Sequence, residues 1–93
     1  MKNWRNPYLI VREDGIGLLD LANNEIHILK PDEIPAVLAA LPDSAWPYGR
    51  VVAIQESGVA GSDAGKVQIR KNRALLAGTL EALKVAITWV PSA

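Results

Sequence analysis

The sequence has no cysteine and no phenylalanine, and one histidine among its 93 residues. Without cysteine, neither a disulfide framework nor a thiolate metal site can form. Because His27 is the single histidine, any other metal ligands would be carboxylates. The acidic residues are scattered over predicted turns and a helix start, where helix capping accounts for their presence. The sequence therefore predicts no metal centre and no cofactor.

Long hydrophobic runs are also missing. The longest apolar runs stop well short of the ~18 residues that a membrane span needs, and the N-terminal residues reach a turn signal at Asn6-Pro7 without an apolar core. The chain has the length of one small domain, residues 1–93, and its hydrophobic share of 49% is ample for a core. We expect a cytoplasmic protein without a membrane partner.

Net charge is absent too, but the zero total hides two opposite parts. Residues 66–93 hold five basic residues and one acid, whereas residues 1–65 hold five basic residues and nine acids. Four of the C-terminal cations fall within residues 66–73. Because the whole chain is not basic, with a pI near 6.6, a dedicated nucleic-acid binder is not expected.

Three short β patterns open the chain. Tyr8–Arg12 is rich in β-branched and aromatic residues and runs into Asp14-Gly15, a common hairpin turn. Ile16–Leu21 is predicted to return, and Asn23-Asn24 offers a second tight turn before Glu25–Lys30. These residues predict a three-stranded antiparallel meander.

The rest of the chain alternates helices and strands. A helix of about ten residues is predicted after Pro31, with Asp32 as its cap, and it ends at Pro42. Later segments are a strand over Arg50–Gln55, a helix from Ser62 or Asp63 to about Lys84, and a strand over Val85–Val90, although Val67–Arg70 also fits a short strand. The fold class is thus α+β, in the order β-β-β-α-β-α-β, with a mixed five-stranded sheet.

Two helices are too few to cover both faces of such a sheet, and we place them mainly on one face. The closing strand has apolar residues on both of its sides, which favours coverage of both faces. The second face is therefore either partly wet or covered by another subunit. We expect a homodimer or another protein partner.

A glycine-bearing loop before the second predicted helix is a candidate anion site. Glycines let backbone N–H groups approach a phosphate, and a helix N-terminus attracts an anion. The match to a phosphate-binding loop fails at Ala60 and Val67, which stand where that motif has glycine and serine or threonine. The simpler alternative is a flexible loop followed by a solvated basic helix face. The candidate residues are Gly58, Gly61, Ser62, Gly65, Lys66, Arg70 and Arg73.

Aromatic residues form the second candidate, an interaction surface. Trp46 and Tyr48 flank a proline in an irregular loop, and Trp89 lies in the closing strand. Such side chains bury much area at a small entropic cost when a partner binds. The alternative is that Trp46 covers the edge of the core, and the residue tendencies favour it.

Catalytic groups are scarce. No G-x-S-x-G pattern is present, and only Glu56, Ser57 and His27 stand out as acid–base or nucleophilic candidates. The leading hypothesis is therefore a small, self-associating, non-catalytic interaction module. The alternative is a domain that binds a phosphate-bearing small molecule or nucleotide through residues 58–66, and a small enzyme is the third hypothesis.

Overall fold

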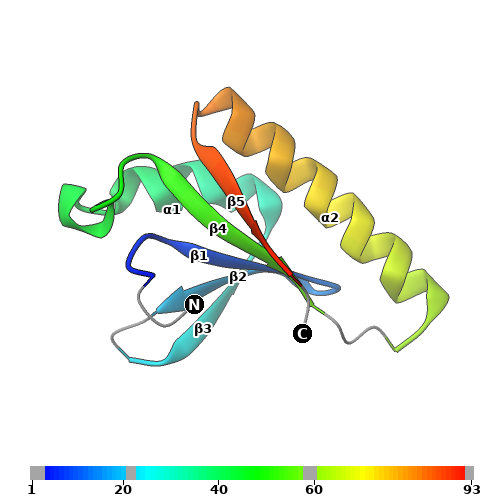
Figure 1. Ribbon diagram of the computed structural model, residues 1–93. Helices are drawn as coiled ribbons and strands as arrows, with labels where there is room; N and C mark the ends of the chain where they lie inside the picture. The colour runs from blue at the N-terminus through cyan, green and yellow to red at the C-terminus, as the bar shows by residue number, and fades with distance from the viewer. Residues whose placement is uncertain (1–3, 21–22, 58–60, 92–93) are drawn as a thin grey trace.

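The computed structural model describes residues 4–20, 23–57 and 61–91, and two helices and five strands lie in this part of the chain (Figure 1). Short 3₁₀ turns at Pro31–Glu33 and Asp43–Ala45 flank the first helix. The elements are β1 (Tyr8–Arg12), β2 (Gly15–Asp20), β3 (Glu25–Leu29), α1 (Ile34–Ala40), β4 (Val51–Glu56), α2 (Asp63–Ala82) and β5 (Ala86–Val90).

The five strands form one mixed sheet in the order β3-β2-β1-β4-β5. β1 and β2 pair antiparallel, as do β2 and β3, whereas β4 is parallel to both β1 and β5. This arrangement confirms the predicted α+β class, the element order and the parallel pairing of the last two strands. β1 and β4 lie inside the sheet, and β3 and β5 form its two edges.

The first hairpin turns one residue earlier than predicted. Glu13 and Asp14 form the turn, and Gly15 already belongs to β2. Gly15 has φ +144°, and a Cβ at this position would collide with the carbonyl oxygen of Leu29. Only glycine therefore fits here, because the neighbouring strand passes so closely.

Both helices pack on the same face of the sheet and contact each other. Side chains alternate along each strand, so every second residue points into the space below the helices. The core there contains Leu9, Val11, Ile16, Val52 and Ile54 from the strands, and Ile34, Leu38, Ile69, Leu76 and Leu80 from the helices.

Helix α1 begins differently from the prediction. Asp32 makes no capping hydrogen bond, so its predicted role was wrong. The carboxylate of Glu33 instead accepts a hydrogen bond from the backbone N–H of Lys30 at 2.8 Å. Pro35 lies in the first turn of α1, where its missing N–H has no cost.

Helix α2 is continuous from Asp63 to Ala82, which removes the alternative of a strand over Val67–Arg70. Ser62 is its N-cap, and its Oγ accepts a hydrogen bond from the N–H of Gly65 at 3.1 Å. Asn72 holds the helix to the sheet, because its buried amide donates to the carbonyl of Arg12 at 2.8 Å.

Candidate functional site

The predicted anion site lies at the start of α2, beside a carboxylate of the protein itself. Gly65 is buried, and a Cβ on it would lie 2.7 Å from Oε2 of Glu13. The Glu13 carboxylate thus rests against the first turn of the helix, where the helix dipole favours a negative charge. An incoming phosphate would have to displace this carboxylate or accept its repulsion.

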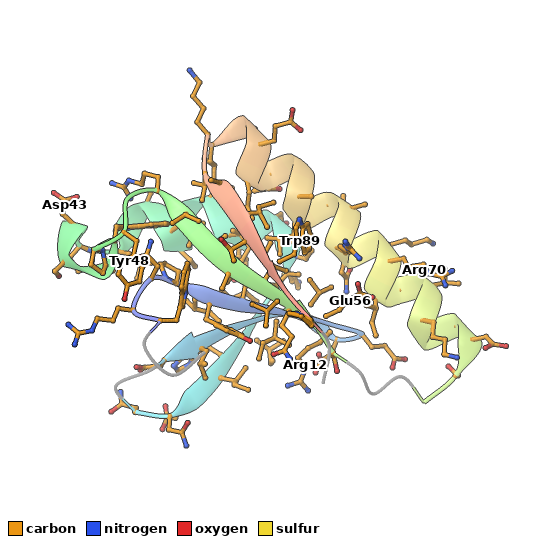
Figure 2. The ribbon with its side chains drawn as sticks, in the orientation of Figure 1. Arg12, Asp43, Tyr48, Glu56, Arg70 and Trp89 are labelled. Carbon is orange, nitrogen blue, oxygen red and sulfur yellow. The ribbon has the colours of Figure 1, made fainter. Side chains whose placement is uncertain are left out.

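The basic residues of α2 do not converge on this helix start. Lys66 and Arg70 are exposed, whereas Arg73 donates to Oε2 of Glu56 at 2.7 Å. The Arg73 guanidinium also stacks on the ring of Trp89, 4.2 Å from its centroid. Glu56, Arg73 and Trp89 therefore form one cluster that ties α2 to the ends of β4 and β5. Glu56 and Trp89 are labelled in Figure 2.

Two further residues of the predicted anion site give no support for anion binding. Gly61 precedes the helix and faces open space, since nothing lies within 4 Å of a Cβ built on it. Gly58 lies outside the described residues. The structure thus brings Ser62, Gly65 and Lys66 together at the helix start, and it directs Arg73 to a different cluster.

The predicted aromatic surface is divided between the core and the exterior. Trp46 is only 7% exposed and belongs to the hydrophobic core, with Arg50 stacked 4.6 Å from its ring centroid. Tyr48 is exposed and packs on Trp4 at 5.3 Å between ring centroids. The alternative that the sequence favoured for Trp46, a place at the edge of the core, matches this burial.

Asn6 holds the aromatic loop in place and was missed by the sequence analysis. Its buried amide donates to the carbonyls of Gly49 and Val51 at 2.8 and 2.7 Å, and its carbonyl accepts from the N–H of Tyr48 at 3.0 Å. Nothing in the local sequence indicates that the asparagine before Pro7 forms hydrogen bonds with a loop more than forty residues away.

The second face of the sheet has no helix over it in the part of the chain that the structure describes. Tyr8 lies on this face, donates to the side-chain oxygen of Gln55 at 2.8 Å, and has a pKa raised by burial. Among the described strand residues, Arg12 is the one charged side chain on this face. The apolar members are Ile10, Leu19, Ile26, Ile28, Val51, Ala53, Ala86 and Val90, as the strand registers place them.

Strand β3 is the most exposed part of the sheet. Four of its five residues, Glu25 to Ile28, are exposed. Ile26 and Ile28 point to the uncovered face and keep 43% and 42% of their surface in solvent. An edge strand with two exposed isoleucines is an unusual feature in a stable monomer.

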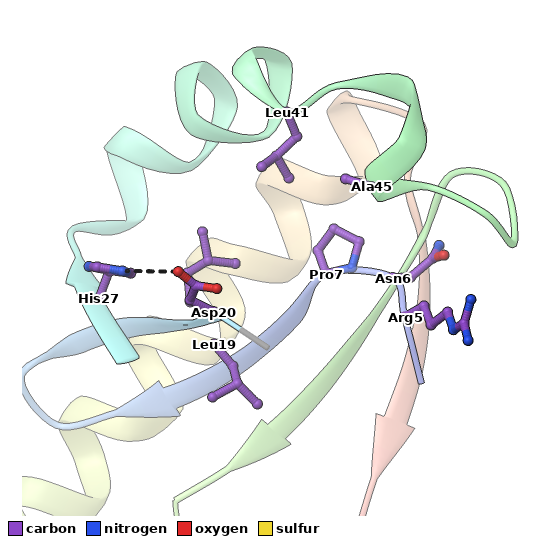
Figure 3. A pocket seen from close by; sticks show the side chains of 9 residues that line it. Arg5, Asn6, Pro7, Leu19, Asp20, His27, Leu41 and Ala45 are labelled. Carbon is purple, nitrogen blue, oxygen red and sulfur yellow. Dashed lines mark ion pairs between the residues drawn. The ribbon is translucent and has the colours of Figure 1, made fainter. Parts of the chain in front are cut away.

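On the helix side, His27 borders a hollow of about 330 Å³ between the ends of β2 and α1 (Figure 3). Its Nε2 lies 4.0 Å from Asp20 and 3.9 Å from Glu25. Asp20 also accepts hydrogen bonds from the backbone and side chain of Asn23. The apolar side chains of the lining come from Pro7, Leu18, Leu41 and Ala45.

The three acid–base candidates do not form one site. His27 lies on β3 and Glu56 at the end of β4, three strand spacings away, or about 14 Å across the sheet. Ser57 follows Glu56, and its N–H donates to the carbonyl of Val11. This separation rules out a direct proton transfer between His27 and either of the other two residues.

Metal and membrane features are missing from the described residues as well. Within residues 4–20, 23–57 and 61–91, no three acidic or imidazole groups gather closely enough to hold a metal ion. Neither helix there is both long and apolar enough to cross a bilayer. Comparison with protein-family models, curated proteins and solved structures found no match.

Proposed function

We propose that this chain is a non-catalytic protein-interaction module that associates with a second copy of itself at the part of its sheet where Ile26 and Ile28 are exposed. One observation carries the proposal: Ile26 and Ile28 stand side by side, each more than 40% exposed, on a sheet face that lacks a covering layer among the described residues. Full burial of an isoleucine side chain contributes roughly 1.5–3 kcal/mol. A partner that covers both would gain a substantial part of that energy.

The composition of the uncovered face favours a protein partner over a small ligand. Parallel strands such as β1, β4 and β5 usually have both faces covered, because their side chains are apolar on both sides. This face is broad, and its charged strand residue, Arg12, is already paired with Asp14 at 2.9 Å. An apolar protein surface fits such a face.

A second copy is the partner that the charge of the chain favours. The formal net charge is zero, so two copies approach without net electrostatic repulsion. The cytoplasmic location belongs to this proposal too, because a cysteine-free chain suits a reducing compartment. The phosphate-binding alternative has weaker support, because Glu13 and not an open space adjoins the start of α2.

Sedimentation velocity tests the proposal with one charge placed on the uncovered face. Ile26→Lys should shift the native dimer to a monomer, because it replaces an apolar contact of the association with a strongly hydrated ammonium group. The lysine stem still covers Gly17, which Ile26 contacts, so the fold should survive. Leu75→Lys is the matched control, since Leu75 is 57% exposed but lies on α2.

Two results would overturn the proposal. The first is a native chain that remains a monomer up to several hundred micromolar. The second is a dimer that Ile26→Lys and Leu75→Lys weaken equally, since association would then not depend on the uncovered face.

A further inference from the structure

We infer that the two copies join edge to edge through β3, whose residues 25–29 pair antiparallel with the same segment of the second copy, with His27 opposite His27. This inference rests on the proposed self-association and adds the strand, the direction and the register. It would make one continuous ten-stranded sheet from two five-stranded sheets.

The outer edge of β3 is open. β3 is the terminal strand of the sheet, and no other described element lies beside its outer edge (Figure 1). Edge strands are usually protected by a short length, charged side chains, proline or a bulge. The charged residues Glu25 and Lys30 and the proline Pro31 stand only at the ends of β3, and five consecutive residue pairs join β3 to β2 without a bulge.

The middle of the uncovered face is less available than β3. Ala53 is fully buried by its neighbours, and Gly17 is buried beneath Ile26. Tyr8 leans along the face to reach Gln55. Exposed apolar surface on this face is therefore concentrated at the β3 edge, which favours edge pairing over face-to-face packing.

The opposite edge, β5, is a poorer pairing surface. Arg73 stacks on the helix side of Trp89 in β5, which keeps 46% of its surface exposed, and it also pairs with Glu56. A strand that approached β5 would meet this charged cluster and helix α2. Pairing at β3 meets no comparable group on the uncovered face.

The register follows from the self-complementarity of β3. A two-fold axis perpendicular to the sheet keeps the uncovered faces of both copies on one side. When the axis passes midway between His27 of the two copies, Ile26 lies opposite Ile28 of the second copy, and Ile28 lies opposite Ile26. Cross-strand pairs of β-branched residues stabilise a sheet. An axis through Ile26 or Ile28 would instead oppose an isoleucine to Asn24 or to Lys30.

Polar groups of the two copies also meet on the helix side in this register. Glu25 comes opposite Leu29 of the second copy, next to the exposed Lys30 of that copy. The two His27 rings would meet, and each ring already has Asp20 and Glu25 within 4.0 Å. Negative groups therefore surround the paired imidazoles, and Lys30 of the opposite copy balances part of this charge.

Single cysteines test the register directly, because the native chain has none. In an antiparallel ladder, opposing Cα atoms lie about 4.5–5.5 Å apart, within the range that a disulfide spans. His27→Cys should form a covalent dimer under mild oxidation. Ile26→Cys mixed with Ile28→Cys should form a covalent dimer of the two variants. This mixture also tests the register if the Ile26–Ile28 pair, and not the His27 pair, has the shorter Cα–Cα distance.

Two further variants separate edge pairing from its alternatives. Ile10→Cys lies on β1, so edge pairing holds the two thiols about 24 Å apart, or five strand spacings. Face-to-face packing would bring these thiols together instead. Leu75→Cys reports collisional cross-linking, and the β3 thiols should react at least about tenfold faster, since pairing gives a millimolar effective concentration.

The possible outcomes distinguish edge pairing through β3 from the self-association on which it rests. Rapid cross-linking through β3, with Ile10→Cys at the collisional rate, supports edge pairing. A dimer by sedimentation that cross-links through Ile10→Cys, or that shows only the collisional rate at β3, overturns edge pairing and leaves self-association intact. A reduced chain that sediments as a monomer overturns both.

Discussion

Because Glu13 contacts Gly65, replacing each of two glycines of helix α2 by alanine should change stability by different amounts. Gly65 and Gly78 both lie within α2. In a helix interior, glycine costs about 0.5–1 kcal/mol relative to alanine. Gly78 is exposed, with nothing within 4 Å of a Cβ, so Gly78→Ala should gain this amount.

Gly65→Ala should gain much less, or lose stability. Its Cβ would lie 2.7 Å from Oε2 of Glu13, so the carboxylate must move away from the first turn. The interaction of a carboxylate with a helix N-terminus contributes about 0.3–1 kcal/mol, and its loss offsets the gain in helix propensity. The two variants should therefore differ by roughly 0.3–1 kcal/mol in the free energy of unfolding, on the same principle.

Thermal unfolding followed by circular dichroism measures this difference. A domain of this size shifts in Tm by about 4–8 °C per kcal/mol. Gly78→Ala should thus raise Tm by several degrees, and Gly65→Ala should leave it near the native value. In a Glu13→Gln background, which removes the charge–dipole interaction, the cost of Gly65→Ala should become smaller.

If Gly65→Ala raises Tm as much as Gly78→Ala does, the Glu13 carboxylate does not oppose a side chain at position 65. The same conclusion follows if Glu13→Gln leaves the effect of Gly65→Ala unchanged, because the stability lost in Gly65→Ala is assigned to the Glu13 carboxylate. High salt should reduce the difference between the two glycines, since the helix-dipole interaction is screened.

Two other predictions concern Trp46 and Tyr8. Trp46→Ala should destabilise the fold by about 3–5 kcal/mol in urea unfolding, because the indole is a buried core group; a loss below about 1 kcal/mol would contradict its place in the core. Burial raises the pKa of Tyr8 above its ordinary value, so the folded state binds the phenolic proton more tightly than the unfolded state. Stability from this group is complete below pH ~10 and is lost as the pH rises through the folded-state pKa, and Tyr8→Phe should remove that part of the alkaline loss in urea titrations at pH 8–11. An unchanged alkaline profile in Tyr8→Phe would contradict the assignment.

The sequence by itself determined the order of the elements and most of their bounds. Turn residues and apolar periodicity mark them locally, as Pro42 does at the end of α1 and Ser62 at the start of α2. A polar residue at a core position also left a signal that could have been used. Asn72 stands between Ile69 and Leu76 at helical spacing, and it holds α2 to the end of β1.

Only the tertiary structure decided which groups meet. Glu13 reaches Gly65 because the β1–β2 turn and the start of α2 come together, although they are about fifty residues apart in the chain. Asn6 reaches Gly49 and Val51 for the same reason. Local patterns carry no information on such pairs, since each depends on how the strands order themselves in the sheet.

The position of β3 is the clearest case of this division. Its alternating residues predict a strand, and they predict equally well a central strand and an edge strand. The order β3-β2-β1-β4-β5 places it at the edge, and two helices on the opposite face leave Ile26 and Ile28 exposed. Strand composition is local, whereas exposure depends on what packs above and beside the strand, and the packing of the whole chain decides that.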